Sequence, residues 1–183
     1  MSILLTRRSV RKFTTEAVSD DNIRHILRAA MYAPSAVNKQ NWQFYVVKRG
    51  EKLAELATIW DSKILDKTTM EKEFYTSRSA ILRSAAAAIL ICGVSETELG
   101  EGESWPVNCG AATQNLLLAA HELGLGGVWL GVFNLAPRIK EVIEFFNLPA
   151  NHRPFALCAI GHPAAVPAES KERYDESKVH WIK

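Results

Sequence analysis

Apolar residues recur every three or four positions in four segments of the chain, which is the spacing that places them on one face of a helix. These segments are residues 20–33, 53–60, 104–123 and 137–146. The first follows Ser19, a residue type that caps helix N-termini, and stops at Pro34. The longest ends just before Gly124, which suits the position after a helix C-terminus.

Four shorter segments are rich in β-branched and aromatic residues, which predicts strands. They are residues 42–47, 87–94, 126–133 and 155–160. Residues 87–94 are apolar almost throughout, and 42–47 carry apolar or aromatic residues on both faces, so we expect both strands to be internal to a sheet. Residues 61–79 lack a clear period and are predicted to be a loop or a short helix. Strands mixed with long helices indicate an α/β or an α+β fold.

Two regions do not fit a simple core. The helix predicted over 104–123 is apolar almost all round, which is typical of a helix at the centre of a core or at a subunit interface. Residues 164–183 are polar with few core positions, and are expected to dock on something or to remain loose. No repeat or domain boundary is visible, so we expect one domain over residues 1–183.

Composition narrows the class of protein. The chain has 183 residues, 48% hydrophobic and 23% charged, with a formal net charge of +2. That charge is too small to indicate a nucleic-acid or membrane partner, and the apolar run 85–94 is too short to span a bilayer. The three cysteines, Cys92, Cys109 and Cys158, are widely spaced, which favours buried free thiols over disulfides or zinc. With no signal-peptide pattern, we expect a reducing, cytoplasmic location.

The stretch TRRSVRKF, residues 6–13, places four basic side chains within six positions. If it is extended, Arg7, Ser9 and Arg11 point the same way and form a strip of donors about 13 Å long, which suits a phosphorylated ring compound. A solvated basic arm is the plain alternative. A nucleic-acid arm is disfavoured because no second basic cluster or aromatic platform accompanies it.

Three other stretches are weaker candidates when each is taken alone. APSAVNKQNW, residues 33–42, offers backbone groups and an asparagine amide to a planar ligand, or is an ordinary turn. LGLGGVWLG, residues 123–131, is no dinucleotide fingerprint, since its glycines follow a helix and precede a strand. In SKER, residues 170–173, two basic side chains lie two positions apart, so they either face the same side of an extended chain or belong to a solvated tail. The five histidines show no metal-binding spacing, and no G-x-S-x-G appears, so no metal site or hydrolase is expected.

Taken together and in order, these motifs resemble the FMN-dependent nitroreductase family. The resemblance rests on RRSVRKF, on APSxxNxQxW, on NLLLAAxELGLGxxWxG, and on GHP followed by KxR, and it runs from about Ser2 to Arg173. It implies an α+β fold with a central, mostly antiparallel sheet flanked by helices, in an intertwined homodimer. Helix 106–123 would then form the dimer core, and the tail would embrace the partner subunit.

The resemblance also implies the residues that bind FMN. Arg7 and Ser9 would hold the phosphate with Lys171 and Arg173, while Arg11 would reach the pyrimidine end of the ring and stabilise its reduced form. A loop of the partner subunit would also contact the flavin, and a segment of one strand would line the ring near its reactive edge. The full expected set is Arg7, Arg8, Ser9, Arg11, Pro34, Ser35, Ala36, Asn38, Trp129, Leu130, Gly131, Lys171 and Arg173.

The implied activity is ping-pong hydride transfer from NADH or NADPH through flavin N5 to a small electron-poor acceptor, such as a nitroaromatic or a quinone. Flavin destruction, reductive dehalogenation and flavin binding without turnover are the alternatives. Three positions depart from the usual pattern: Asn41 replaces a common proline, and Ala36 and Val37 replace common glycines. A ring-binding amide expected within residues 61–79 has no recognisable counterpart, and the sequence does not decide between NADH and NADPH.

Overall fold

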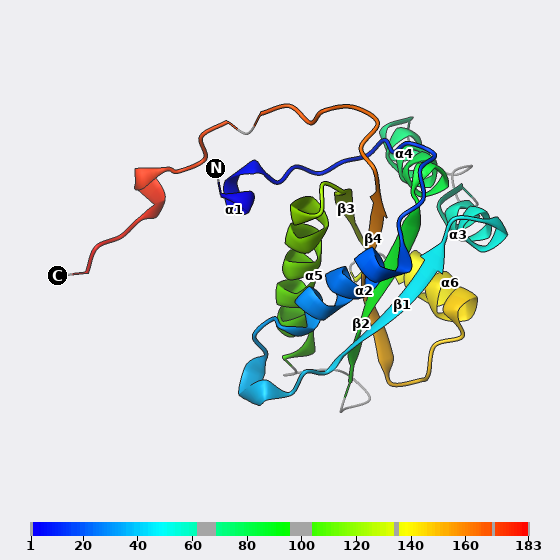
Figure 1. The fold of residues 1–183 in the computed structure, drawn as a ribbon. Coiled ribbons are helices and arrows are strands. Elements are labelled where there is room, and N and C mark those ends of the chain that lie inside the picture. The colour runs from blue at the N-terminus through cyan, green and yellow to red at the C-terminus, as the bar shows by residue number, and fades with distance from the viewer. Residues whose placement is uncertain (1, 62–68, 96–103, 134–135, 170, 183) are drawn as a thin grey trace.

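Four antiparallel strands form one sheet in the order β1-β2-β4-β3 (Figure 1). The strands are β1 (Trp42–Lys48), β2 (Ala87–Val94), β3 (Gly126–Gly131) and β4 (His152–Gly161). The computed structural model describes residues 2–61, 69–95, 104–133, 136–169 and 171–182. The predicted antiparallel sheet is confirmed.

Helices cover both faces of this sheet (Figure 1). Side chains alternate along β2, so Ile89 and Ile91 enter one core while Ala88 and Leu90 enter the other. The first core lies under α2 (Asp20–Met31) and α5 (Trp105–Glu122), and the second under α3 (Glu51–Asp61), α4 (Thr69–Ser84) and α6 (Ala136–Phe146). The result is the three-layered α+β arrangement that the resemblance implied.

The local signals set most helix ends as expected. The Ser19 hydroxyl accepts a hydrogen bond from the Asn22 amide, which caps α2, and Gly124 follows α5 with φ of 73°. Two expectations were wrong. β1 is an edge strand, because it lies at the end of the strand order next to β2, and its apolar and aromatic residues are only partly buried. Residues 69–84 form the long helix α4, whose mixed polar sequence hides its period; the rest of the uncertain stretch, 62–68, lies outside the described residues.

The N-terminal arm, residues 7–13, lies along the free edge of β3. After the short helix α1 (Ile3–Thr6), Ser9 bridges to Gly127 and the Val10 amide donates to the Gly127 carbonyl at 3.0 Å. Val10 and Phe13 are buried. A Cβ at Gly126 would lie 2.6 Å from the Cβ of Val10, so only glycine lets the arm approach this closely. The extended conformation expected for the basic stretch is therefore confirmed.

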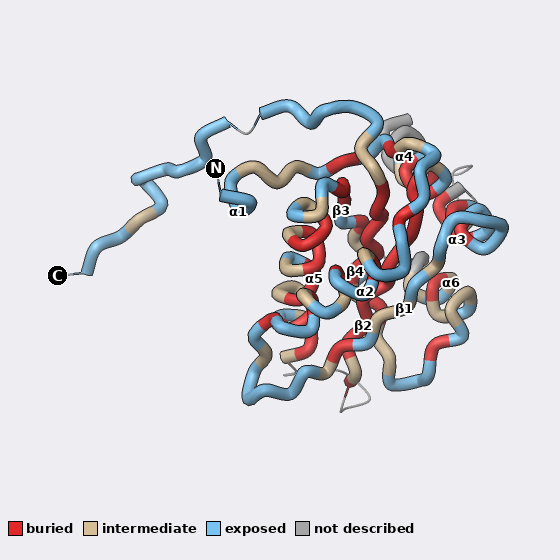
Figure 2. Tube along the Cα trace, in the orientation of Figure 1, coloured by how far each residue is buried: buried red, intermediate tan, exposed pale blue. Residues whose placement is uncertain are grey.

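The C-terminal tail leaves β4, passes over the N-terminal arm and ends away from the three layers (Figure 1). Most of it is exposed, including Trp181 and Ile182, at 76% and 95% of their surface (Figure 2). Across the described parts of the chain, we find no helix with both the length and the apolar character needed to cross a membrane.

Candidate cofactor site

Arg7 is the centre of the basic cluster in the N-terminal arm. Its Nη1 atom is buried, and no hydrogen-bond partner reaches it from the part of the chain that the structure describes. Burial lowers the pKa of Arg7 first, and the nearby charges of Arg173 and Arg8 lower it further. A partly buried cation whose buried Nη1 atom has no partner, and which is repelled by two neighbouring cations, is costly, and an anion bound here would relieve both costs.

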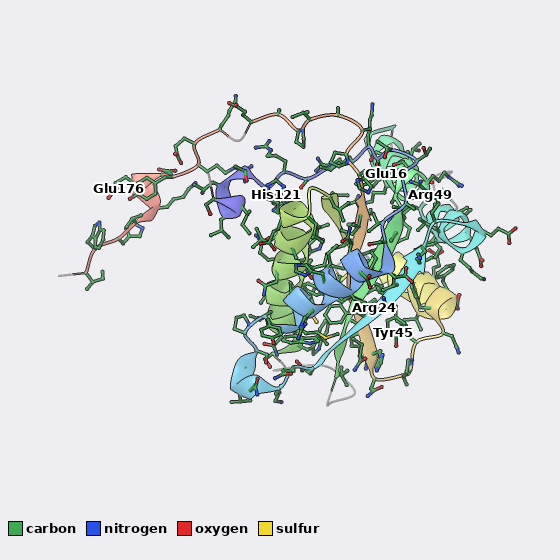
Figure 3. The ribbon with its side chains drawn as sticks, viewed as in Figure 1. Glu16, Arg24, Tyr45, Arg49, His121 and Glu176 are labelled. Atoms are coloured by element: carbon green, nitrogen blue, oxygen red, sulfur yellow. The ribbon has the colours of Figure 1, made fainter. Side chains whose placement is uncertain are left out.

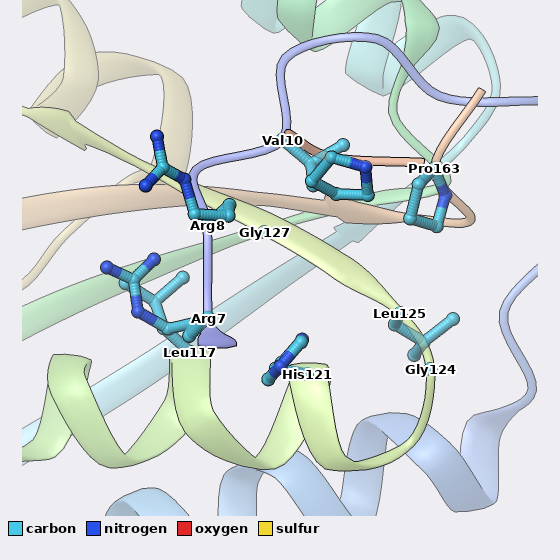
Figure 4. A pocket seen from close by; sticks show the side chains of 10 residues that line it. Arg7, Arg8, Val10, Leu117, His121, Gly124, Leu125, Gly127 and Pro163 are labelled. Carbon is cyan, nitrogen blue, oxygen red and sulfur yellow. The ribbon is translucent and has the colours of Figure 1, made fainter. Parts of the chain in front are cut away.

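A cavity of about 140 Å³ lies beside this cluster (Figure 4). It lies where the arm crosses the C-terminal end of α5 and the start of β3. On its wall, the His121 ring nitrogen Nε2 lies 2.9 Å from the Thr6 hydroxyl. The lining residues are Arg7, Arg8, Val10, Leu117, His121, Gly124, Leu125, Gly127, Pro163 and Pro167. The cavity therefore combines two cations with an otherwise mainly apolar wall.

The arm does not alternate strictly from Arg7 onward. Arg7 and Arg8 both line the cavity, whereas strict alternation would have pointed them apart. The reason is that Arg7 is the C-cap of α1, where the backbone turns from helix to extended chain. Alternation holds from Ser9 to Arg11, since these two residues are exposed on either side of buried Val10. It ends at Lys12, which is exposed before buried Phe13.

Arg49 fixes the far end of the arm. Its guanidinium donates to the carbonyls of Thr14 and Ser84, at 2.8 and 2.6 Å, and also to that of Thr15. Its Nε donates to the Ala85 carbonyl at 3.1 Å. Figure 3 shows Arg49 close to Glu16, where the arm passes the end of β1. One fork-shaped side chain thus joins the arm to the end of α4 and the start of β2.

The β3 candidates lie on the same sheet edge as the arm. Trp129 is partly exposed and packs on Phe155, with ring centroids 5.5 Å apart, while Leu130 is buried. At Gly131, a Cβ would meet nothing within 4 Å, so the backbone faces open space. The edge of β3 can therefore admit a flat ligand close to its backbone.

The loop candidates lie elsewhere. Pro34, Ser35, Ala36 and Asn38 belong to a loop around the short 3-10 helix η1 (Ala36–Asn38), tied to Asn108 near the start of α5. His121 and the cluster lie at the other end of that helix, about 20 Å away at 1.5 Å per residue. Within one chain, the structure brings Arg7, Arg8 and Arg173 together but keeps this loop apart from them. Asn108 was not singled out from the sequence, although a polar residue at an apolar helix position was the available signal.

The family model described as Nitroreductase family matches residues 4–162. The chain belongs to the nitroreductase family. An Archaeoglobus fulgidus relative named "Putative NADH dehydrogenase/NAD(P)H nitroreductase" is 34% identical over 98% of this chain and 95% of its own length.

Solved structures of nitroreductase-family proteins agree. A Bacteroides thetaiotaomicron protein, also named "Putative NADH dehydrogenase/NAD(P)H nitroreductase", is 32% identical, with a TM-score of 0.80, covering 98% of this chain and 94% of that one. A Desulfovibrio desulfuricans nitroreductase solved in complex with FMN is 30% identical, with a TM-score of 0.72, covering 99% and 95%. The motifs singled out in the sequence therefore lie on the nitroreductase fold.

Proposed function

We propose that this nitroreductase-family chain is an FMN-dependent NAD(P)H oxidoreductase that reduces small electron-poor acceptors, such as nitroaromatics or quinones. One observation carries the proposal: Arg7 is a partly buried cation with an unpartnered Nη1, and Arg8 and Arg173 repel it. A dianionic phosphate satisfies such a cluster. The FMN bound by the Desulfovibrio desulfuricans relative carries this group.

The residues present fit FMN along its length. Arg7, Arg8 and Arg173, with Ser9 and Lys171, are the phosphate ligands in this proposal. From Arg7 to Arg11 the extended arm spans about 13 Å, so Arg11 reaches the opposite end of a bound flavin. The remaining contacts fall to Trp129, Leu130 and Gly131, where the open backbone at Gly131 leaves room for a ring.

When bound, FMN supplies the redox chemistry by accepting a hydride from NADH or NADPH and delivering reducing equivalents to the acceptor. The chain's own residues bind, orient and tune it. Arg11 provides a fixed positive charge near the part of the ring that becomes negative on reduction. Trp129 offers an aromatic face beside the ring, and the arm holds the phosphate end so that the ring stays in place.

The proposal includes a homodimer. The loop of Pro34, Ser35, Ala36 and Asn38 lies too far from Arg7 of its own chain to share one flavin, so it serves the partner's site. Val107, 76% exposed on α5, and the exposed tail residues Trp181 and Ile182 supply apolar surface for that contact. In this arrangement α5 lies at the subunit interface and the tail, residues 164–183, docks on the partner.

The deciding experiment is the absorption spectrum of the purified chain. A yellow protein that bleaches anaerobically with NADH or NADPH, and regains its colour when a nitroaromatic or a quinone is added, supports the proposal. Bleaching that no oxidant reverses indicates flavin destruction instead. Bound flavin that neither nucleotide reduces indicates a flavin-binding protein without turnover, and a colourless protein that takes up no FMN overturns the proposal.

A further inference from the structure

Asn108 joins the two ends of the loop that carries Ser35 to Gln40. It is a buried polar residue on α5, with 2% of its surface exposed. Its Oδ1 accepts a hydrogen bond from the Ala36 amide at 3.0 Å, and its Nδ2 donates to Oδ1 of Asn41 at 2.8 Å. One amide group therefore fixes the start and the end of the loop at the same time.

The backbone between these two anchors is strained. Val37, Asn38 and Gln40 have φ values of 46°, 56° and 49°, in the left-handed region that side chains other than glycine avoid. Val37 is β-branched, for which this conformation is especially unfavourable. Strain of this kind persists only where surrounding contacts hold it, and it is concentrated at functional sites.

Apolar burial does not hold the loop, because every residue from Ala36 to Gln40 is exposed and Val37 is 88% exposed. Polar contacts hold it instead. Within the loop, the Gln40 amide donates to the Ser35 hydroxyl at 3.1 Å. At its end, the Asn41 carbonyl accepts from the Val94 amide of β2 at 2.8 Å. The two hydrogen bonds of Asn108 tie this loop to α5.

We propose that Asn108 is a positioning residue for the flavin site of the partner subunit. By clasping Ala36 and Asn41, it holds the strained loop in the shape that presents Val37 and Asn38 outward, toward a second copy of the chain. Because Asn108 lies on α5, the helix that also bears exposed Val107, the loop is fixed relative to the surface that meets the partner. This inference rests on the proposed function, since it concerns the flavin site named there.

Four variants of the full-length chain test it. Asn108→Leu removes both bonds of the clasp at similar volume, and Asn41→Leu removes one of them. Asn41→Asp keeps the oxygen that accepts from Asn108 and is the conservative variant. Thr113→Val is the matched control: Thr113 is equally buried on α5, and its hydroxyl donates to the Cys109 carbonyl of the same helix at 2.7 Å, away from the loop.

Two kinds of measurement are made on each purified chain as isolated. Hydrogen exchange at the Ala36 amide reports the loop directly, without any turnover. FMN titration and steady-state reduction of a nitroaromatic report the site. For Asn108→Leu we expect Ala36 exchange at least tenfold faster, and the FMN dissociation constant and the acceptor KM each at least fivefold higher, with kcat within twofold. Asn41→Leu shifts the same constants less, while Asn41→Asp and Thr113→Val stay within twofold of the natural chain.

The outcomes separate this inference from the proposed function. A natural chain that takes up no FMN overturns the proposed function, and this inference with it. A natural chain that binds FMN and turns over, while Asn108→Leu matches Thr113→Val in both constants, overturns this inference alone. If Asn108→Leu speeds Ala36 exchange but leaves the FMN affinity and the acceptor KM unchanged, this inference alone is also overturned, because the two hydrogen bonds of Asn108 would then have only a structural role.

Discussion

Arg7 and Arg173 come from opposite ends of the chain, and their guanidinium groups lie close enough to repel each other. After burial, the charge of Arg173 is the largest cause of the lowered pKa of Arg7. Like charges are brought together in this way where an anion binds between them. The tail reaches this position because it passes over the N-terminal arm before it leaves the rest of the molecule (Figure 1).

Replacing Arg7 tests the phosphate end of the site. Arg7→Ala should weaken FMN binding by roughly 10- to 100-fold, because a charge-assisted hydrogen bond contributes about 1.5 to 3 kcal/mol. Fluorescence titration of the flavin-free chain with FMN measures this. Lys12→Ala, which removes an exposed cation from the same arm, is the control and should leave the dissociation constant nearly unchanged. Equal effects of the two variants would assign the binding to net charge.

Replacing Arg11 tests the ring end. Arg11→Gln removes a positive charge from the region that becomes negative on reduction, so the midpoint potential of bound FMN should fall by roughly 30 to 60 mV. Redox titration against a reference dye measures it, with Lys12→Gln as the matched control. A potential equal to that of the natural chain would remove Arg11 from this role.

Arg49 should stabilise the fold by anchoring the arm. Arg49→Ala removes donors from the carbonyls of Thr14 and Ser84, among others, and should lower the free energy of unfolding by about 1 to 3 kcal/mol. Urea unfolding followed by circular dichroism measures the change. Arg24→Ala, which removes only a surface pair with Asp21, should cost less than about 1 kcal/mol. A loss no larger than this would mean that Arg49 does not anchor the arm.

The three thiols should be inert in the folded protein. Burial raises the pKa of Cys109 and Cys158 from 9.0 to about 12, and also raises that of Cys92. Folding therefore favours the neutral thiols; this contribution is complete below about pH 9 and is lost as the pH rises through about 12. A thiol-reactive dye at pH 8 should label the chain only after denaturation. Rapid labelling of the native protein would contradict the burial of these residues.

The end of the tail should strengthen the proposed dimer. A chain that stops at Tyr174 keeps Lys171 and Arg173 but loses Trp181 and Ile182. Its dimer should dissociate at concentrations at least tenfold higher than the dimer of the full chain. The reason is that burying each such side chain contributes about 1.5 to 3 kcal/mol. Sedimentation velocity over a concentration series measures this. An unchanged monomer–dimer equilibrium would show that the tail does not dock on the partner.

The sequence by itself determined much of the local structure. Ser19, Pro34 and Gly124 set helix boundaries through capping and backbone geometry, which depend on neighbouring residues only. The apolar run of β2 identified the central strand because it is covered on both faces. The order of the motifs identified the nitroreductase family, which the family model confirms.

Only the tertiary structure decided what depends on contacts between distant segments. β1 carries an internal-looking pattern yet is an edge strand, because strand order is set by pairing and not by local composition. The Asn108 clasp needs α5 and the loop before β1 to lie side by side, which no spacing along the chain reveals. In the same way, Arg7 is a candidate for an anion site because it is partly buried and lies near the charge of Arg173. Electrostatic repulsion depends on distance in space and not on distance along the sequence, so this could not be read from the sequence.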